Sequence, residues 1–403
     1  MKNKAVKVFL GVILAIVAVF GIIAVVNSVK SESGIKEAAS PAVSASADRN
    51  EAKPPETVKA PVTLSVVSVG DNLIHDGIYE QAKKRADGSG YDFSFAYKRI
   101  ADTISKADIA TINQETVIAK SYQPSGYPLF NSPGELGAEI IKTGFDVINM
   151  ANNHMIDKTS KGLSEAIDYW SSQDGIVKTG AYKNSDEMNT VEYIEKDGIK
   201  IGLIGITQYT NGLSLPKGSE LKIIYSSDED TIKSKIEASK KQCDMVLVNI
   251  HWGNEYTTTP VDGQKALAKK MAEWGADVII GHHPHVIEPV EWIENTDGSR
   301  TLVAYSLGNF ISQQNTAARV IGGMLHYDIT KDFETGKITV SHVVFEPIVT
   351  HYVSGSHDVQ IYPLSQYTDK LAKAQSGRIK QNDFSISYIN NFTEKIIDKE
   401  FLK

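Results

Sequence analysis

The chain has 403 residues, of which 41% are hydrophobic, so it is long enough to bury the core of one large domain or two ordinary ones. Its net charge of −7 combines interspersed acidic and basic residues, without the basic face that binds duplex nucleic acid. Composition therefore argues against nucleic acid as the main partner and is compatible with an enzyme.

The N-terminal region contains an unbroken apolar segment, residues 8–26, preceded by three lysines within residues 1–7. The length of this segment predicts a transmembrane helix, and the lysines predict a cytoplasmic N-terminus with the rest of the chain outside the cell. A cleavable signal peptide is the alternative, with a distant small-x-small site at 45–47. The segment is longer than a usual signal-peptide core, so we expect an uncleaved single-pass anchor in the cell membrane.

Residues 27–61 are rich in Ser, Ala, Lys, Glu and Pro and contain no aromatic residue. Such a composition cannot bury enough apolar area to fold, so it predicts a disordered linker. The single cysteine, Cys243, excludes an intramolecular disulfide, and its place beside an apolar run indicates a small buried side chain rather than a nucleophile.

From residue 62 onward, strand-like and helix-like segments alternate, which is typical of an α/β domain with mainly parallel central strands. The predicted strands are 64–69, 109–112, 147–150, 175–178, 199–206, 245–250, 277–280 and 302–305. The predicted helices are 95–106, 133–142, 162–172, 230–241 and 263–274. Strands at 324–329 and 338–345 have no helix between them, which predicts antiparallel additions to the sheet. We assign 62–350 to this domain and 351–403 to a C-terminal extension with a possible helix near 368–374.

Residues that can bind metals follow several of the predicted strands. The densest group is Gly281-His282-His283-Pro284-His285, and the others are Asp71 with His75, Asn113 with Glu115, Asn153 with His154, and His251. Ligands of α/β sheets bind beyond the carboxyl ends of the strands, so a single sheet would bring these side chains to one edge. Taken singly, each has an ordinary explanation: a helix cap, a turn residue, a core histidine or a solvated loop. Their joint occurrence favours a site.

Asp, Glu, Asn and His together suit divalent Mn, Fe or Zn. Five or six such ligands exceed what one tetrahedral ion needs, which predicts two ions bridged by a carboxylate. A site of this kind activates water and holds both the attacking and the leaving oxygen of a phosphoester, and it can also polarise an amide carbonyl.

Six motifs occur in order between residues 64 and 310: Val69-Gly70-Asp71, Asn113-x-Glu115, Ala151-Asn152-Asn153-His154, His251-Trp252-Gly253, Gly281-His282-His283-Pro284-His285 and Ser306-Leu307-Gly308-Asn309-Phe310. In this combination the chain resembles the CapA-type poly-γ-glutamate capsule biosynthesis proteins, a branch of the calcineurin-like metallophosphoesterase superfamily. The resemblance implies a calcineurin-like metallo-dependent phosphatase fold, with central β-sheets flanked by helices.

The resemblance also implies a role for each motif residue. Asp71 and His285 would hold one ion, Asn153, His251 and His283 the other, with Glu115 as the bridge and His154 as the general acid. Further candidate ligands are His75, Asn113 and His282, while Ser306 and Asn309 would fix the surrounding loops. The chain departs from the superfamily in two places, because Asp71 is followed by Asn72 and Leu73 instead of an Asp-x-His pattern, and Asn113-Gln114-Glu115 replaces Gly-Asp-x-x-Asp.

We therefore expect a membrane-anchored extracellular protein that acts in capsule polymer synthesis or export. Its partners would be membrane synthase or export subunits and an anionic polymer such as poly-γ-glutamate. A metal-dependent hydrolase of a phosphoester or amide bond in an envelope polymer is the alternative, and an inactive scaffold is a third reading. Trp252 and Tyr256 are either a substrate wall or core residues, and Glu288 and Glu291 are expected on a solvated strand face.

Overall fold

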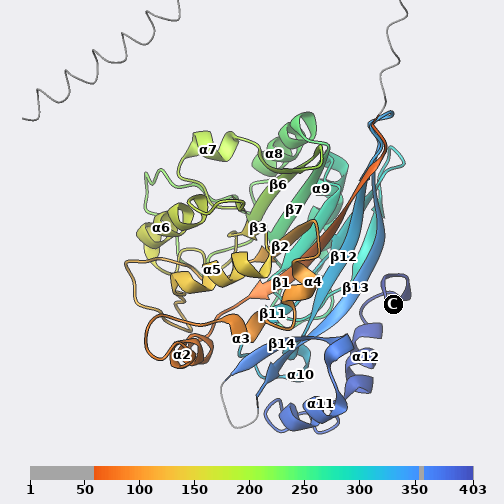
Figure 1. The fold of residues 1–403 in the computed structure, drawn as a ribbon. Helices are drawn as coiled ribbons and strands as arrows, with labels where there is room; N and C mark the ends of the chain where they lie inside the picture. The colour runs from red at the N-terminus through yellow and green to blue at the C-terminus, as the bar shows by residue number, and fades with distance from the viewer. Residues whose placement is uncertain (1–58, 354–357, 403) are drawn as a thin grey trace, which may run out of the picture. The chain divides into compact units, whose positions relative to one another are not determined.

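The computed structural model describes residues 59–353 and 358–402 (Figure 1). The predicted transmembrane segment 8–26, and the linker up to residue 58, lie outside the described residues. Within the described part of the chain, no helix is both long enough and apolar enough to cross a bilayer.

The first of two β-sheets in the described structure has the order β14-β13-β12-β1-β2-β3-β4, with β11 paired to β1 beyond this path. Strands β1 to β4 run parallel, whereas β12, β13 and β14 pair antiparallel, as predicted for the strands that have no helix between them. The bounds are β1 Val62–Asn72, β2 Ile109–Asn113, β3 Val147–Asn149, β4 Val177–Thr179, β11 Asn309–Ile311, β12 Ile321–Lys331, β13 Ile338–Tyr352 and β14 Val359–Pro363.

The second sheet has the order β5-β6-β7-β8-β10-β9. Its four central strands are parallel and its two edge strands, β5 and β9, are antiparallel. The bounds are β5 Glu192–Lys196, β6 Ile199–Thr207, β7 Met245–His251, β8 Val278–His282, β9 Val290–Glu294 and β10 Arg300–Ala304.

The α-helices of the described residues are α2 Asp76–Arg85, α3 Ser94–Tyr97, α4 Ala101–Ile104, α5 Gly134–Thr143, α6 Thr159–Ser171, α7 Ser185–Asn189, α8 Glu229–Gln242, α9 Asp262–Trp274, α10 Ala317–Val320, α11 Asp369–Ser376 and α12 Ile386–Glu394, with short 3-10 turns η1 Leu364–Gln366 and η2 Lys399–Phe401. The single helix predicted over 95–106 is wrong. The segment is divided into α3 and α4, because the intervening turn closes with a hydrogen bond from the amide of Ile100 to the carbonyl of Tyr97. The side chains of both residues are buried. The α/β class itself is confirmed.

Alternate residues of the central strands face different cores. On β1, Leu64 and Val66 belong to a core between the two sheets, whereas Val67 and Val69 belong to a core beneath α2, α5 and α6. On β7, Met245 and Leu247 likewise face the first sheet, whereas Val246 and Val248 face α8 and α9. Figure 1 shows α8 and α9 beside β6 and β7. The order of layers is therefore helix, sheet, sheet, helix.

The expectation of a single sheet is wrong, and the two-sided burial explains why. A strand covered on both faces has an apolar run without alternation, and this run carries no information about which neighbour the strand pairs with. β1, β2 and β3 pair in one sheet and β6, β7 and β8 in the other. The carboxyl ends of both parallel sets nevertheless meet at the same end of the sandwich.

Close approach of backbone at this end depends on glycine. A Cβ added to Gly281 of β8 would lie 1.9 Å from the carbonyl oxygen of Tyr305, which accepts the indole hydrogen bond of Trp252. We expect Gly281→Ala to lower the free energy of unfolding by about 3 kcal/mol or more, since the neighbouring backbone must move. Urea denaturation measures the loss. Gly263→Ala is the control, because its added Cβ meets nothing within 4 Å in α9 and should raise stability by up to about 1 kcal/mol. Equal stability of Gly281→Ala and the wild type would contradict the packing described here.

Candidate metal centre

The polar residues predicted from strand ends are delivered to one place by both sheets. Asp71 lies at a register shift near the end of β1, Glu115 lies two residues after β2, and Asn153 and His154 lie in the turn after β3. His251 ends β7, and His282 ends β8 ahead of the loop that carries the other two histidines. All of these side chains except that of His154, which is 6% exposed, are at most 2% exposed.

A first group is formed by Asp71, Glu115 and His285, whose ligand atoms all lie within 4.8 Å of one another. Nδ1 of His285 is 3.0 Å from Oδ2 of Asp71, and its Nε2 is 3.7 Å from Oε1 of Glu115. His285 has a φ of +59°, so the loop adopts a left-handed conformation to aim this ring at the two carboxylates.

A second group is formed by Asn153, His251 and His283. Nε2 of His251 is 3.1 Å from Oδ1 of Asn153 and 3.1 Å from Nδ1 of His283. It is also 3.8 Å from Oε1 of Glu115. The same carboxylate oxygen of Glu115 therefore lies between the two groups, at nearly equal distances from His251 and His285.

The surroundings of three imidazoles, those of His251, His282 and His283, favour their neutral form. Burial, with neighbouring histidines, holds the pKa of His251 well below its ordinary value, and burial lowers the pKa of His283 to about 3 and that of His282 to about 4. A neutral imidazole retains the lone pair that a metal ligand needs. These rings are thus in the form that binds cations.

The two carboxylates of the first group differ. Burial favours the neutral acid of Asp71, but its contacts with His285 and His282 outweigh that effect and hold its pKa below the ordinary value. Burial, together with the charge of Asp71, raises the pKa of Glu115 well above its ordinary value. Neither oxygen of Glu115 has a hydrogen-bond partner among the described residues. A buried carboxylate without partners is costly unless a cation joins it.

Two of the further candidates, Asn113 and His282, have other partners. Asn113 donates from Nδ2 to Oδ1 of Asp71 at 2.8 Å and accepts from Nδ2 of Asn149 at 2.9 Å, so both ends of its amide are used in orienting Asp71. Nε2 of His282 lies 3.3 Å from Oδ1 of Asn249, while its Nδ1 is 3.8 Å from Asp71. These residues lie directly behind the first group.

His154 lies beside the second group and is held by a carboxylate. Its Nδ1 is 2.8 Å from Oδ2 of Asp157, which also accepts the amide of Phe130 at 2.7 Å. The ring of Phe130 meets His154 edge to face at 4.7 Å between centroids and His75 at 5.2 Å. His75 is thus near His154, but its Nδ1 accepts the amide of Gln313 at 3.2 Å.

Three residues at the site were not predicted from the sequence. The hydroxyl of Tyr209, which follows β6, contacts Nε2 of His283. Asn211 accepts from the amide of Asn153 at 3.3 Å and lies 3.4 Å from Nδ1 of His154. Glu255 forms a further set of potential ligands with His283 and His285, whose ligand atoms lie within 4.8 Å of one another. The loop after β6 satisfies the same strand-end criterion that identified the other loops, and that signal would have located Tyr209 and Asn211.

Ser306 and Asn309 hold the histidine loop. The hydroxyl of Ser306 donates to the carbonyl of Val286 at 2.8 Å, and Nδ2 of Asn309 donates to the carbonyl of His285 at 3.2 Å. Trp252 is 2% exposed and packs in the core beneath α8 and α9, whereas Tyr256 is 42% exposed at the rim of the site.

The expectation of a solvated Glu288 is wrong. Its side chain is 0% exposed and accepts a hydrogen bond of 2.8 Å from Gln264 of α9, while Oε1 has no partner among the described residues. Glu291 accepts a hydrogen bond from the hydroxyl of Tyr305 at 2.7 Å.

Cys243 is half-buried, and burial raises the pKa of its thiol, which disfavours the nucleophilic thiolate.

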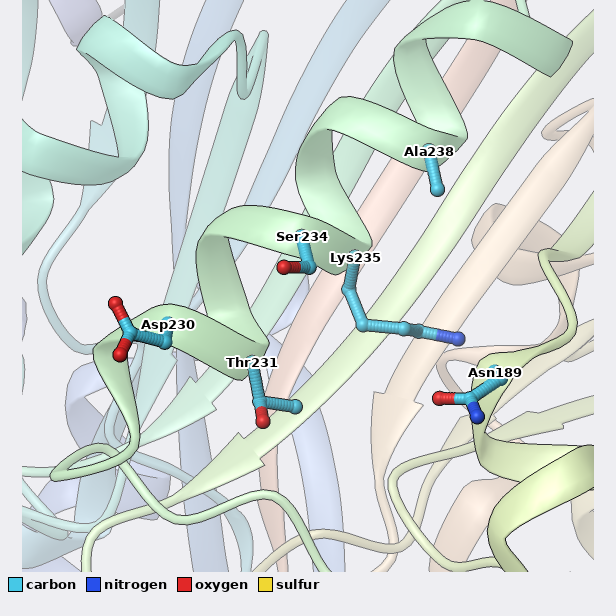
Figure 2. A pocket seen from close by; sticks show the side chains of 6 residues that line it. All are labelled: Asn189, Asp230, Thr231, Ser234, Lys235 and Ala238. Atoms are coloured by element: carbon cyan, nitrogen blue, oxygen red, sulfur yellow. The ribbon is translucent and has the colours of Figure 1, made fainter.

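A separate hollow of about 380 Å³ lies between α7 and α8 and is lined by Asn189, Asp230, Thr231, Ser234, Lys235 and Ala238 (Figure 2). Figure 2 shows Lys235 extending from α8 toward Asn189. Its ammonium donates to the carbonyls of Met188 and Thr190 at 2.7 Å each. Lys235 therefore ties the two helices together, and the hollow is not part of the candidate site.

The residues of the two groups fit divalent cations. Asn153 Oδ1, His251 Nε2 and His283 Nδ1 converge within hydrogen-bond range, although the single proton that His251 Nε2 can carry cannot serve both neighbours. These converging lone pairs lie beside the carboxylate of Glu115, which has no hydrogen-bond partner among the described residues. Together they match the nitrogen and oxygen ligands of borderline divalent metals. Both groups combine Asp, Glu or Asn oxygens with imidazole nitrogens.

The fold and the site define an α/β protein with a buried imidazole and carboxylate centre suited to divalent cations. The chain belongs to the family of bacterial capsule synthesis proteins PGA_cap, whose model matches residues 65–314, and the family resemblance predicted from the motifs is confirmed. The PGA biosynthesis protein CapA of Bacillus subtilis is 29% identical over 283 residues, covering 70% of this chain and 71% of that protein. The capsule biosynthesis protein CapA of Bacillus anthracis is 28% identical over 291 residues, covering 70% and 67%.

Among solved structures, the NAD nucleotidase NadN of Haemophilus influenzae aligns with a TM-score of 0.43 and 13% identity, over 84% of this chain and 60% of that one. Because this score is low, the alignment adds nothing to the family assignment.

Proposed function

We propose that this protein acts in the synthesis or export of an anionic capsule polymer of the poly-γ-glutamate type, and that its site works with bound divalent cations. The family assignment and the names of the two CapA relatives, a PGA biosynthesis protein and a capsule biosynthesis protein, support the polymer. The observation that carries the metal is Glu115, a fully buried carboxylate that lies between two imidazole-bearing groups and has no hydrogen-bond partner among the described residues.

In the proposed site, Asp71, Glu115 and His285 would hold one cation and Asn153, His251 and His283 another. Such cations supply Lewis acidity toward an oxygen of the substrate. Asn113 fixes the rotamer of Asp71, and the loop contacts of Ser306 and Asn309 fix the direction of His285. These supporting contacts reduce the movement that the ligands need before they bind.

Metal analysis of the purified full-length chain tests this proposal. We expect about one to two divalent ions per chain, as two ligand groups sharing one carboxylate allow. In the host organism, deletion of the gene should remove the surface polymer, and the wild-type gene should restore it whereas a His251→Ala gene should not. A chain without bound metal, or complementation by His251→Ala, would refute the proposed site.

A second candidate function is metal-dependent hydrolysis of a phosphoester or amide bond in an envelope polymer, and the contact between His154 and Asp157 favours it. Asp157 holds Nδ1, so Nε2 of His154 is the atom that can give a proton to a leaving oxygen. This candidate function includes the proposal that the domain has the calcineurin-like metallophosphoesterase fold.

We expect His154→Ala to lower metal-dependent hydrolysis of bis(p-nitrophenyl) phosphate by about 100-fold or more, with the metal content unchanged. His342→Ala is the matched control, because His342 is also paired with a carboxylate, Asp328, but on the exposed surface of β13. Unchanged turnover in His154→Ala would exclude this residue as the proton donor.

We further propose that residues 8–26 anchor the chain in the cell membrane and that the domain from residue 62 lies outside the cell, beside the membrane subunits that make or export the polymer. The support is the length of the apolar segment and the lysines before it. Protease added to intact cells should remove the domain from residue 62 and leave the N-terminal segment in the membrane fraction. Protection of the domain in intact cells would place it on the cytoplasmic side.

A further inference from the structure

An aromatic ring and an arginine lie at the rim of the candidate metal centre. The loop after β7 turns back to the histidine loop, where the amide of Tyr256 donates to the carbonyl of Pro284 at 2.8 Å. The ring of Tyr256 lies 6.1 Å from the ring of His285, and the guanidinium carbon of Arg319 lies 3.4 Å from the centre of the Tyr256 ring. His285, Tyr256 and Arg319 therefore form a row that leads from the buried site to its edge.

The backbone of this row is held in a costly conformation. Tyr256 has a φ of +66°, in the left-handed region that costs a residue with a side chain about 1 kcal/mol or more. Backbone strain of this kind persists where the surroundings impose it, and it concentrates at functional sites. Here the contacts with Pro284 and Arg319 oppose the strain and keep the ring facing the site.

Arg319 is held at its backbone, and its side chain has no acidic partner within the described part of the chain. Its carbonyl, in α10, accepts a hydrogen bond of 3.0 Å from Asn309, and the same amide donates to the carbonyl of His285. Across residues 59–353 and 358–402, its guanidinium makes no ion pair or side-chain hydrogen bond, and the side chain is half-buried. Stacking uses the face of a guanidinium, whereas its N–H donors lie in the plane and remain available to an oxyanion.

We propose that Arg319, positioned by Tyr256, binds an oxyanion of the substrate next to the part of the substrate held at the metal centre. The inference rests on the proposed function, since an anionic polymer presents such groups repeatedly along its length. A carboxylate of a γ-linked glutamate chain and a phosphate share the required chemistry, because both accept two parallel N–H bonds from one guanidinium. Arg319 would therefore select anionic chains and set their register.

Binding of a short fluorescein-labelled γ-linked glutamate oligomer to the full-length chain, followed by anisotropy with Mn²⁺ and with chelator, tests the inference. We expect Arg319→Gln to weaken binding about 10-fold or more and Arg319→Lys to recover part of the loss. Tyr256→Phe should bind like the wild type and Tyr256→Gly should lose affinity, because only the ring positions the guanidinium. Arg300→Gln is the matched control, since Arg300 stacks on Trp292 at 4.4 Å but begins β10, at the end opposite the site.

The source of the oxyanion is distinguished by two competitors. Competition by the unlabelled oligomer but not by its fully amidated form identifies carboxylates, and stronger competition by inorganic phosphate identifies a phosphate. Equal binding by Arg319→Gln and the wild type, or no Arg319-dependent binding of either anion, would overturn the inference. The metal content is measured in the same samples. If the purified wild type contains no metal and Arg319→Gln still weakens oligomer binding, the role of Arg319 is supported and the proposed metal site is refuted. If the wild type contains metal and Arg319→Gln binds the oligomer equally well, the metal site is supported and the inference about Arg319 is overturned.

Discussion

Glu115→Gln should change stability in opposite directions with and without divalent metal. In chelator, we expect the variant to be more stable than the wild type by about 1 to 3 kcal/mol, because the substitution removes a buried carboxyl group that has no hydrogen-bond partner in the described structure. In excess Mn²⁺, the order should invert. The wild type gains the free energy of metal binding in its folded state, whereas the variant lacks the ligand that lies between the two groups.

Metal titration and urea denaturation of the two proteins measure both effects, and we expect the dissociation constant for metal to rise by about 100-fold or more in the variant. Glu192→Gln is the control for loss of a largely buried carboxylate. Glu192 has partners, since it accepts from Thr179 at 2.8 Å and lies 3.5 Å from the ammonium of Lys178. Its substitution should therefore destabilise the protein equally with and without metal. The same behaviour from Glu115→Gln would mean that Glu115 has a structural role.

The longer buried strands of the fold were predictable, whereas the short buried strands β11 and β14 were not. The apolar runs of β1, β6, β7 and β8 stand out because both faces of these strands are covered. The edge strands β5 and β9 were not predicted, since they are short and contain exposed and charged residues: β5 alternates between half-buried and exposed residues, and β9 has a single buried residue, Val290. The division into two sheets was also not predictable from periodicity, because it depends on pairings between strands far apart in the chain.

The candidate site was predictable to the extent that its residues share one local signal, a polar side chain just after a buried strand. Asp71, His251 and His283 carry that signal, and the structure brings them together. Arg319 does not, because α10 contributes it from a short helix between β11 and β12. Its guanidinium reaches the site through the ring of Tyr256, more than sixty residues earlier in the sequence, and its backbone carbonyl through Asn309. Contacts of this kind arise from tertiary packing and leave no pattern in the local sequence.

The burial of Glu288 was not predicted, for a related reason, and this burial has a measurable consequence. Its partner Gln264 lies on α9, so nothing near Glu288 in the sequence indicates that the carboxyl is covered. Burial raises the pKa of Glu288 to about 7, against a hydrogen bond from Gln264 that lowers it.

Because the folded-state pKa of Glu288 is raised, its contribution to stability is complete below the ordinary pKa of 4.5 and is lost as the pH rises through about 7. The loss amounts to about 3 kcal/mol. We expect Glu288→Gln, which resembles the protonated acid, to match the wild type near pH 5 and to exceed its stability by that amount at pH 8 to 9, in urea denaturation with chelator. Gln264→Ala should lower stability at every pH, since it removes a buried hydrogen bond. It should also move the loss of stability to a higher pH than in the wild type, because the bond from Gln264 lowers the pKa of Glu288. Parallel pH curves for the wild type and Glu288→Gln would show that Glu288 ionises freely, which its enclosure beneath α9 does not allow.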